Sequence, residues 1–179
     1  MSDYKVFIRE ETSSDIDEIF QLTQAAFEDA PHTSRMEGHI VNALRRRGQL
    51  ALSMVAVRDR QIVGHVAYSP LKLSSGTAGW FGIGPVSVRP DSQRQGIGSL
   101  LMSLSLFTIK QASAQGCALV GDPAFYSRFG FKHCQHLALP GVPSEFFIAL
   151  SFASKVPCAK VQFDEAFDIA VDETAENVM

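Results

Sequence analysis

The sequence predicts one α/β domain, built from a mixed, mostly antiparallel sheet of about six or seven strands that is flanked by helices. Three observations support this fold class. Helix-like and strand-like runs alternate along the 179 residues. Two β-rich runs, residues 50–58 and 61–73, are separated by only Asp59 and Arg60, which predicts a hairpin. A strand-like run at residues 84–89 is followed by a glycine-bearing turn and a long apolar helix.

The composition is that of a globular domain with a sizeable core. Hydrophobic residues make up 46% of the chain and charged residues 20%. The net charge of −3 argues against a dedicated nucleic-acid surface. Cys117, Cys134 and Cys158 are odd in number and irregularly spaced, which favours a reducing compartment. The charged start of the chain and the lack of a long apolar run predict a cytoplasmic protein that neither crosses nor binds membranes.

The first part of the chain predicts a strand and two helices. Residues 4–9 alternate as in a strand, and Thr12 and Asp15 have the spacing of a capping box before a helix at 15–27. A second amphipathic helix ends in three arginines, residues 45–47, followed by a glycine. Cations in the last turn match the helix dipole, so we interpret this run as a solvated helix end.

The strand predicted at residues 79–89 has an unusual feature. Residues 74–76 form a turn that leads into it, so it is expected to pair antiparallel with the strand before. It contains Pro85, which cannot donate to a sheet ladder. We therefore predict a β-bulge at Gly84 and Pro85.

The rest of the chain predicts a long helix at 97–112 that Gly116 terminates, a buried strand at 118–121 and a short helix at 122–128. The further strands are expected at 131–137, 145–152 and 160–163. Beyond them the chain turns acidic and is expected to be frayed. We accordingly divide the chain into a main domain, residues 1–153, and a C-terminal extension, residues 154–179.

The turn at residues 93–99 has the features of an anion site. The first turn of a helix carries N–H groups without intrahelical partners, and the helix dipole favours negative charge there. Gly96 and Gly98 leave those groups accessible, and Arg94 adds charge. A P-loop is excluded because no lysine follows either glycine. A dinucleotide-binding fingerprint is excluded because the third glycine of that pattern is missing.

The pattern Gln93-x-x-Gly96-x-Gly98, placed after a strand that ends in V-x-V-x-P, resembles the acetyl-coenzyme A site of the GNAT superfamily of N-acetyltransferases. Residues 121–131, G-D-P-A-F-Y-S-R-F-G-F, resemble a later signature of the same superfamily. The sequence around Ile83 and the G-D-P-A-F-Y run are similar to the corresponding sequences of a bacterial subgroup of predicted acetyltransferases. The resemblance spans roughly residues 4–153.

The resemblance implies a GNAT fold whose strands at 79–89 and 118–121 splay apart to hold acetyl-CoA. The cofactor-binding residues that it implies are Val86, Ser87, Val88, Gln93, Arg94, Gln95, Gly96, Ile97, Gly98 and Ser99. Val86 to Val88 would offer backbone groups to the pantetheine arm.

The resemblance further implies direct transfer of the acetyl group to an amine within a ternary complex. Tyr126 occupies the position of the residue that protonates the leaving thiolate; the alternative is a purely structural place in an aromatic core. No acid or histidine lies in residues 81–88, so the sequence does not identify the general base that would deprotonate the amine. His65, Glu28, Glu37, a water relay and an amine that arrives neutral all stay as alternatives.

The acceptor is expected to be a primary amine on a small molecule, a peptide N-terminus or a protein lysine, and a homodimer is left open. No metal is expected, because His133 and His136 would point to opposite faces of one strand. Cys117 is expected to be a buried cysteine rather than a nucleophile. Two alternatives to an enzyme remain: a non-catalytic acyl-CoA-binding or sensing module, and a structural protein on the same fold.

Overall fold

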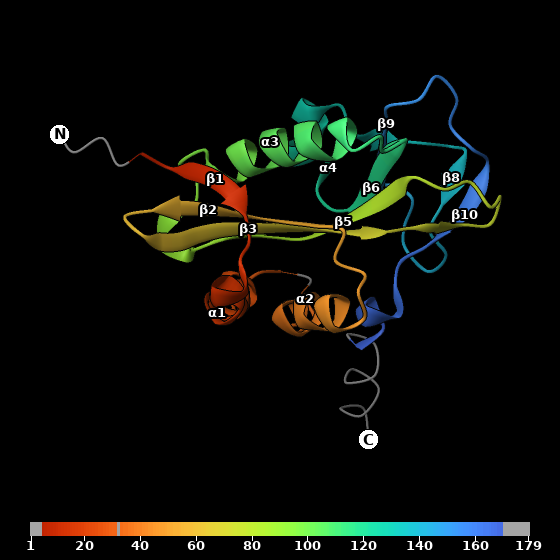
Figure 1. Cartoon of the computed structure of the whole chain (residues 1–179). Helices are drawn as coiled ribbons and strands as arrows, with labels where there is room; N and C mark the ends of the chain where they lie inside the picture. The colour runs from red at the N-terminus through yellow and green to blue at the C-terminus, as the bar shows by residue number, and fades with distance from the viewer. Residues whose placement is uncertain (1–4, 32, 170–179) are drawn as a thin grey trace.

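In the computed structural model, which describes residues 5–31 and 33–169, helices cover both faces of a seven-stranded sheet (Figure 1). Neighbouring strands are antiparallel except for one parallel pair, β5 and β6. The predicted α/β class and mostly antiparallel sheet are therefore confirmed. The strands lie in the order β1 (Phe7–Glu10), β2 (Leu52–Arg58), β3 (Gln61–Pro70), β5 (Trp80–Val88), β6 (Gly116–Val120), β9 (Phe147–Ser151) and β7 (Lys132–His133).

Three long helices form the outer layers. The first two, α1 (Ile16–Phe27) and α2 (Glu37–Arg46), cover one face of the sheet, and α3 (Ile97–Gln111) covers the other (Figure 1). Apolar side chains fill both interfaces because each helix has one apolar face. The buried side chains that α3 contributes include Ile97, Leu101 and Met102. Those that α1 and α2 contribute include Ile19, Leu22 and Val41.

The predicted capping box is confirmed, with one addition. The Thr12 N–H donates to Asp15 Oδ2 at 2.7 Å, and residues Ser13–Asp15 form a short 3-10 turn before α1. Arg9 lies 2.6 Å from the same carboxylate. Its hydrogen bond, which outweighs the effect of burial, holds the pKa of Asp15 well below its usual range.

The arginine run at the end of α2 is more than a solvated helix end. Arg45 pairs with Glu11 at 2.8 Å, and Arg47 lies 2.7 Å from Asp164. Asp164 and Glu165 also bracket the start of a 3-10 turn, Glu165–Phe167, that packs against α2. These partners are distant in sequence, so helix-end chemistry alone could not reveal them.

The hairpin and the bulge lie where the sequence predicts them. Asp59 and Arg60 have φ values of 51° and 65°, as a tight two-residue hairpin turn requires. On the next pair of strands, Val66 faces Val86 while Tyr68 faces Ile83. Gly84 and Pro85 thus face a single residue of β3, which is the geometry of a β-bulge.

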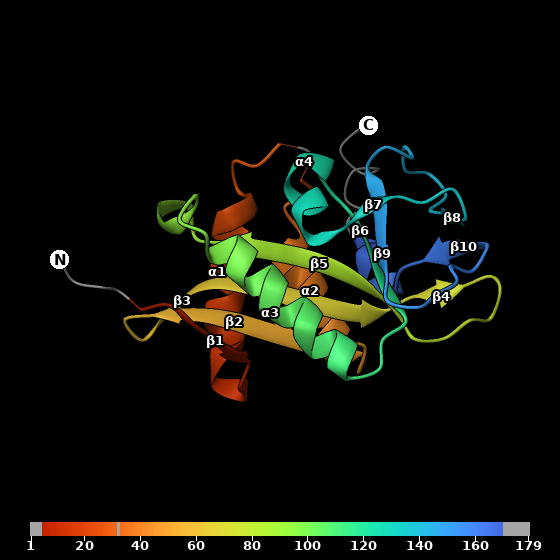
Figure 2. The same ribbon diagram turned by 90° about the horizontal axis from the view of Figure 1, so that it is seen from above.

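The parallel strands β5 and β6 separate after Gly82, just before this bulge. They pair only at Trp80–Gly82 with Gly116–Ala118, although both continue farther. Figure 2 shows the two strands together at one end and apart at the other. The expected splay is therefore present, and it opens toward the N-terminus of α3.

Two predicted boundaries are wrong. Gly116 does not end α3; the helix stops at Gln111, Ser113 takes the left-handed φ of 67°, and Gly116 begins β6 beneath the Trp80 ring. The strand expected at 131–137 is two short strands in different sheets, because the chain leaves the main sheet after His133.

A second sheet contains segments from three parts of the chain. In it, β10 (Ala159–Gln162) lies between β4 (Lys72–Leu73) and β8 (Leu137–Ala138). The strand predicted at 160–163 is confirmed. Of the acidic end that was expected to be frayed, the first residues form the 3-10 turn Glu165–Phe167, and residues 170–179 lie outside the described part of the chain. Across residues 5–31 and 33–169, no helix has both the length and the apolar character needed to cross a bilayer.

Candidate functional site

A cleft of about 500 Å³ lies between the C-terminal half of β5, the N-terminus of α3 and the short helix α4 (Pro123–Tyr126). The splay of β5 from β6 creates this space, since a strand paired along its whole length would leave none. The residues that line it are Val86, Val88, Ser92, Gln93, Arg94, Gly96, Ile97, Gly98, Ser99, Phe125, Tyr126 and Arg128.

The N-terminus of α3 presents free donors to this cleft. Leu100 is the first helical residue whose N–H has an acceptor, the Gly96 carbonyl at 3.0 Å. In the described chain, the N–H groups of Ile97, Gly98 and Ser99 have no acceptor. Gly96 has a φ of 84°, and a Cβ built on it would meet no atom within 4 Å. Open space, free donors and the helix dipole together suit an anion.

The cleft brings most of the residues implied for the cofactor together, but not all of their side chains. Ser87 is buried on the opposite face of β5, where its hydroxyl lies 3.5 Å from that of Thr23. Strand alternation causes this, because Val86 and Val88 take the face that lines the cleft. The Gln95 side chain turns away as well and bonds to Arg58 and to the Asp91 carbonyl.

Three lining residues were missed by the sequence reasoning: Ser92, Phe125 and Arg128. Arg128 lies over the Phe125 ring at 4.9 Å, so the cleft has a second lining cation in addition to Arg94. The signal was present in the run from Phe125 to Arg128, which places both residues on one helical turn.

Tyr126 lies in the cleft with its ring fixed by neighbours. The ring packs edge-on against Phe125 at 4.9 Å and Phe131 at 6.1 Å, and a Cβ at Gly121 would collide with it. Its hydroxyl has no hydrogen-bond partner in the described chain. Burial raises the pKa of Tyr126 to about 12, so the phenol keeps its proton at neutral pH.

The geometry argues against His65 as a base. Its ring is fully buried, and Nε2 lies 2.8 Å from the Ser53 hydroxyl. Burial lowers the pKa of His65 to about 4, so the ring stays neutral. Glu37 accepts hydrogen bonds from Thr33 and Ser34 at the start of α2, and neither it nor Glu28 lines the cleft.

This buried histidine predicts a pH-dependent stability. The unfolded chain binds a proton near pH 6.5 and the folded chain only near pH 4, so unfolding takes up protons between these values. The free energy of unfolding should fall by up to about 3 kcal/mol as the pH drops from 6.5 to 4. Urea denaturation at several pH values measures this slope.

The control is His65→Gln, which removes the titration but keeps Glu11. Burial disfavours the Glu11 carboxylate, but hydrogen bonds from Arg45 and Ser53 outweigh it and lower its pKa. That contribution also disappears in acid and is common to both proteins. The variant should show a flatter slope, and parallel profiles would contradict the assignment.

Neither the cysteines nor the histidines of the later strands form a reactive cluster. Burial raises the pKa of the Cys117 thiol to about 12, as expected for a structural cysteine. In the described residues, no group of three or more His, Cys, Asp or Glu side chains could hold a metal ion. His133 lies on β7, whereas His136 lies beyond the end of this strand. The two histidines therefore do not lie on one strand, contrary to the prediction from the sequence.

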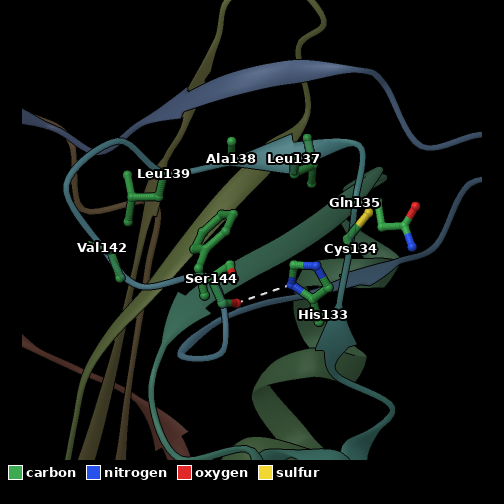
Figure 3. A pocket seen from close by; sticks show the side chains of 9 residues that line it. His133, Cys134, Gln135, Leu137, Ala138, Leu139, Val142 and Ser144 are labelled. Carbon is green, nitrogen blue, oxygen red and sulfur yellow. Dashed lines mark hydrogen bonds between the residues drawn. The ribbon is translucent and has the colours of Figure 1, made fainter.

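A second cavity, of about 330 Å³, lies near the end of β7 and contains none of the predicted site residues. Figure 3 shows the His133 ring directed at the Ser144 carbonyl, to which Nδ1 lies at 3.1 Å. The other residues that line this cavity are mainly apolar, and they include Leu137, Leu139 and Phe147.

Fold and cleft thus define an α/β protein with splayed central strands and a helix whose free N-terminal N–H groups lie at a cleft. Residues 7–134 match the family described as acetyltransferase (GNAT) domain. The uncharacterized N-acetyltransferase YhbS of Escherichia coli (strain K12) is 34% identical over 146 residues, which cover 79% of this chain and 84% of YhbS. The chain belongs to the GNAT acetyltransferase family.

Two solved structures resemble the whole fold. A GNAT family acetyltransferase from Brucella melitensis, in complex with acetyl-CoA, is 41% identical with a TM-score of 0.82, and 92% of this chain and 99% of that one align. YhbS from Escherichia coli, in complex with CoA, is 29% identical with a TM-score of 0.84, and 94% of each chain aligns.

Proposed function

We propose that this protein transfers the acetyl group of acetyl-CoA to a primary amine by direct transfer in a ternary complex. One observation carries the proposal: a single cleft, beside the bulged part of β5, is lined both by residues 96–99, where the free N–H groups of α3 lie, and by Tyr126. The acetyl-CoA and CoA complexes of the Brucella and Escherichia relatives support the same ligand here.

The cofactor would lie along the cleft with its pyrophosphate at α3. The N–H groups of Ile97, Gly98 and Ser99 would donate to it, while Arg94 and Arg128 would balance its charge. The pantetheine arm would follow β5 at 86–88, where Ser87 would act through its backbone only. No metal takes part in this scheme.

The chemistry follows from these positions. A neutral amine attacks the thioester carbonyl, the C–S bond breaks, and the thiolate takes a proton from the Tyr126 hydroxyl. The proton lost by the amine passes to water, since no acid or histidine lies on β5, and the Tyr126 phenolate left behind takes a proton back from water. Direct attack is favoured because no cysteine is among the residues that line the cleft, and Cys117 is buried with a raised pKa.

The acceptor class is a primary amine on a small molecule, a peptide N-terminus or a lysine. The cytoplasm is the compartment that we propose for the reaction, since the chain's cysteines are unpaired. The reaction leaves one thiol for each acetyl group moved, so thiol release reports turnover for any amine.

The test combines calorimetry with that thiol assay. Purified protein should bind acetyl-CoA saturably, and a panel of amines of the three classes should include one that accelerates thiol release. Absence of binding at millimolar acetyl-CoA, in a protein shown to be folded, would refute the proposal. Acetylated product is then identified by mass spectrometry.

A second candidate is a non-catalytic acyl-CoA-binding module. The observation that favours it is the lack of a base: β5 carries none, and His65 is buried and neutral. Such a module would bind acetyl-CoA but release no thiol above the background rate with any amine. Removal of the Tyr126 hydroxyl separates the two candidates further.

A further inference from the structure

The turn that leads into the free N–H groups of α3 is held mainly by side-chain hydrogen bonds. Within it, Gln93 Nε2 donates to the Val88 carbonyl and Gln95 Nε2 to the Asp91 carbonyl, both at 3.1 Å. Between Ser92 and Ile97, which are both buried, residues 93–96 are exposed to solvent. Arg94 and Gly96 both adopt left-handed conformations, with φ values of 58° and 84°. A short exposed segment with a non-glycine residue at positive φ needs external contacts to stay in one conformation.

Arg58 supplies two of these contacts from a distant part of the chain. It is the last residue of β2, and its guanidinium donates to the Ser92 hydroxyl at 2.6 Å and to Gln95 Oε1 at 2.8 Å. One arginine therefore holds both the buried start and the exposed middle of the turn. Since a guanidinium is planar and rigid, two bonds fix the distance between its two acceptors.

The network continues beyond Arg58. The Ser92 hydroxyl donates to Asp91 Oδ1 at 2.8 Å, and Arg89 donates to Asp91 Oδ2 at 2.6 Å and to Gln61 at 2.9 Å. Both strands of the β2–β3 hairpin, where they meet at its closing pair Arg58 and Gln61, are thereby tied to the turn. Arg58 itself does not line the cleft.

We propose that Arg58 is a positioning residue: it holds the turn at 92–96 so that the N–H groups of α3 meet the phosphates of the cofactor. The identity of the ligand in this inference rests on the proposed function, whereas the effect of Arg58 on the turn does not. Without Arg58 the turn would sample other conformations, and binding would have to order it first.

The experiment compares Arg58→Met with Arg46→Met. Arg46 is an exposed arginine of α2, which lies on the face of the sheet opposite α3. Both variants replace an arginine by methionine and therefore lose the same charge. The first readout is tryptic cleavage after Arg94 in the ligand-free protein, detected by mass spectrometry. Exposed and mobile turns are cut faster, so Arg58→Met should be nicked faster than both the wild type and Arg46→Met.

The second readout is acetyl-CoA affinity and turnover. Arg58→Met should weaken binding and raise KM by about tenfold, with kcat within about twofold of the wild type. Arg58→Lys keeps the charge but not the fork, so it should recover only part of the affinity.

The outcomes separate this inference from the proposed function. Equal nicking of Arg58→Met and the wild type would overturn the positioning role, and so would full recovery by Arg58→Lys, which would assign the effect to charge. Faster nicking in a protein whose wild type binds no acetyl-CoA would support the role of Arg58 in the turn and refute the cofactor instead.

Discussion

Replacing Gly96 by glutamate is expected to reduce acetyl-CoA affinity by at least about 100-fold. The glutamate would place a carboxylate where the free N–H groups of α3 point, and it would occupy the space that the phosphates need. It would also repel them. The side chain itself fits the fold, because no atom lies within 4 Å of the position of its Cβ. Calorimetric titration of both proteins measures the loss.

The matched control is Gly48→Glu. Gly48 follows α2 on the other face of the sheet, has a φ of 66° and also has no atom within 4 Å of a built Cβ. Both variants therefore carry the same added charge and the same backbone strain, on the order of 1–2 kcal/mol. Equal affinities of the two variants would show that the N-terminus of α3 does not bind the cofactor.

Replacing Tyr126 by phenylalanine should lower kcat by about 100-fold while the dissociation constant of acetyl-CoA changes less than about twofold. The substitution keeps the ring that packs against Phe125 and Phe131 and removes only the hydroxyl. Without that proton donor, the thiolate would leave as an unprotonated anion. Steady-state kinetics with an accepted amine, together with calorimetry, separates the two quantities.

Tyr68→Phe is the control for this substitution. Tyr68 is fully buried, and its hydroxyl lies 2.8 Å from Ser105 in the core rather than in the cleft. Its loss should cost about 1 kcal/mol of stability without changing kcat. A Tyr126→Phe enzyme as fast as the Tyr68→Phe enzyme would remove Tyr126 from the chemistry and leave it a packing residue.

Much of the fold was predictable because the signals are local. The hairpin at Asp59 and Arg60, the bulge at Gly84 and Pro85 and the turn before Ile97 each depend on the conformational limits of a few neighbouring residues. The glycine spacing predicted, for the same reason, a turn before α3 that the structure places at the cleft. Where a signal was weaker, as at Gly116, the helix ended earlier, because Ser113 can adopt a left-handed φ without glycine.

By itself the sequence determined the α/β class, the order of the main elements, the strand–turn–helix unit that lines the cleft and the family resemblance through its two signatures. Only the tertiary structure decided how distant residues meet. It buried His65, turned the Ser87 and Gln95 side chains away from the cleft, and joined Arg47 to Asp164 and Arg58 to the turn. Local propensities fix the conformation of neighbours, whereas these contacts depend on strand register and layer packing, which are set by the whole chain.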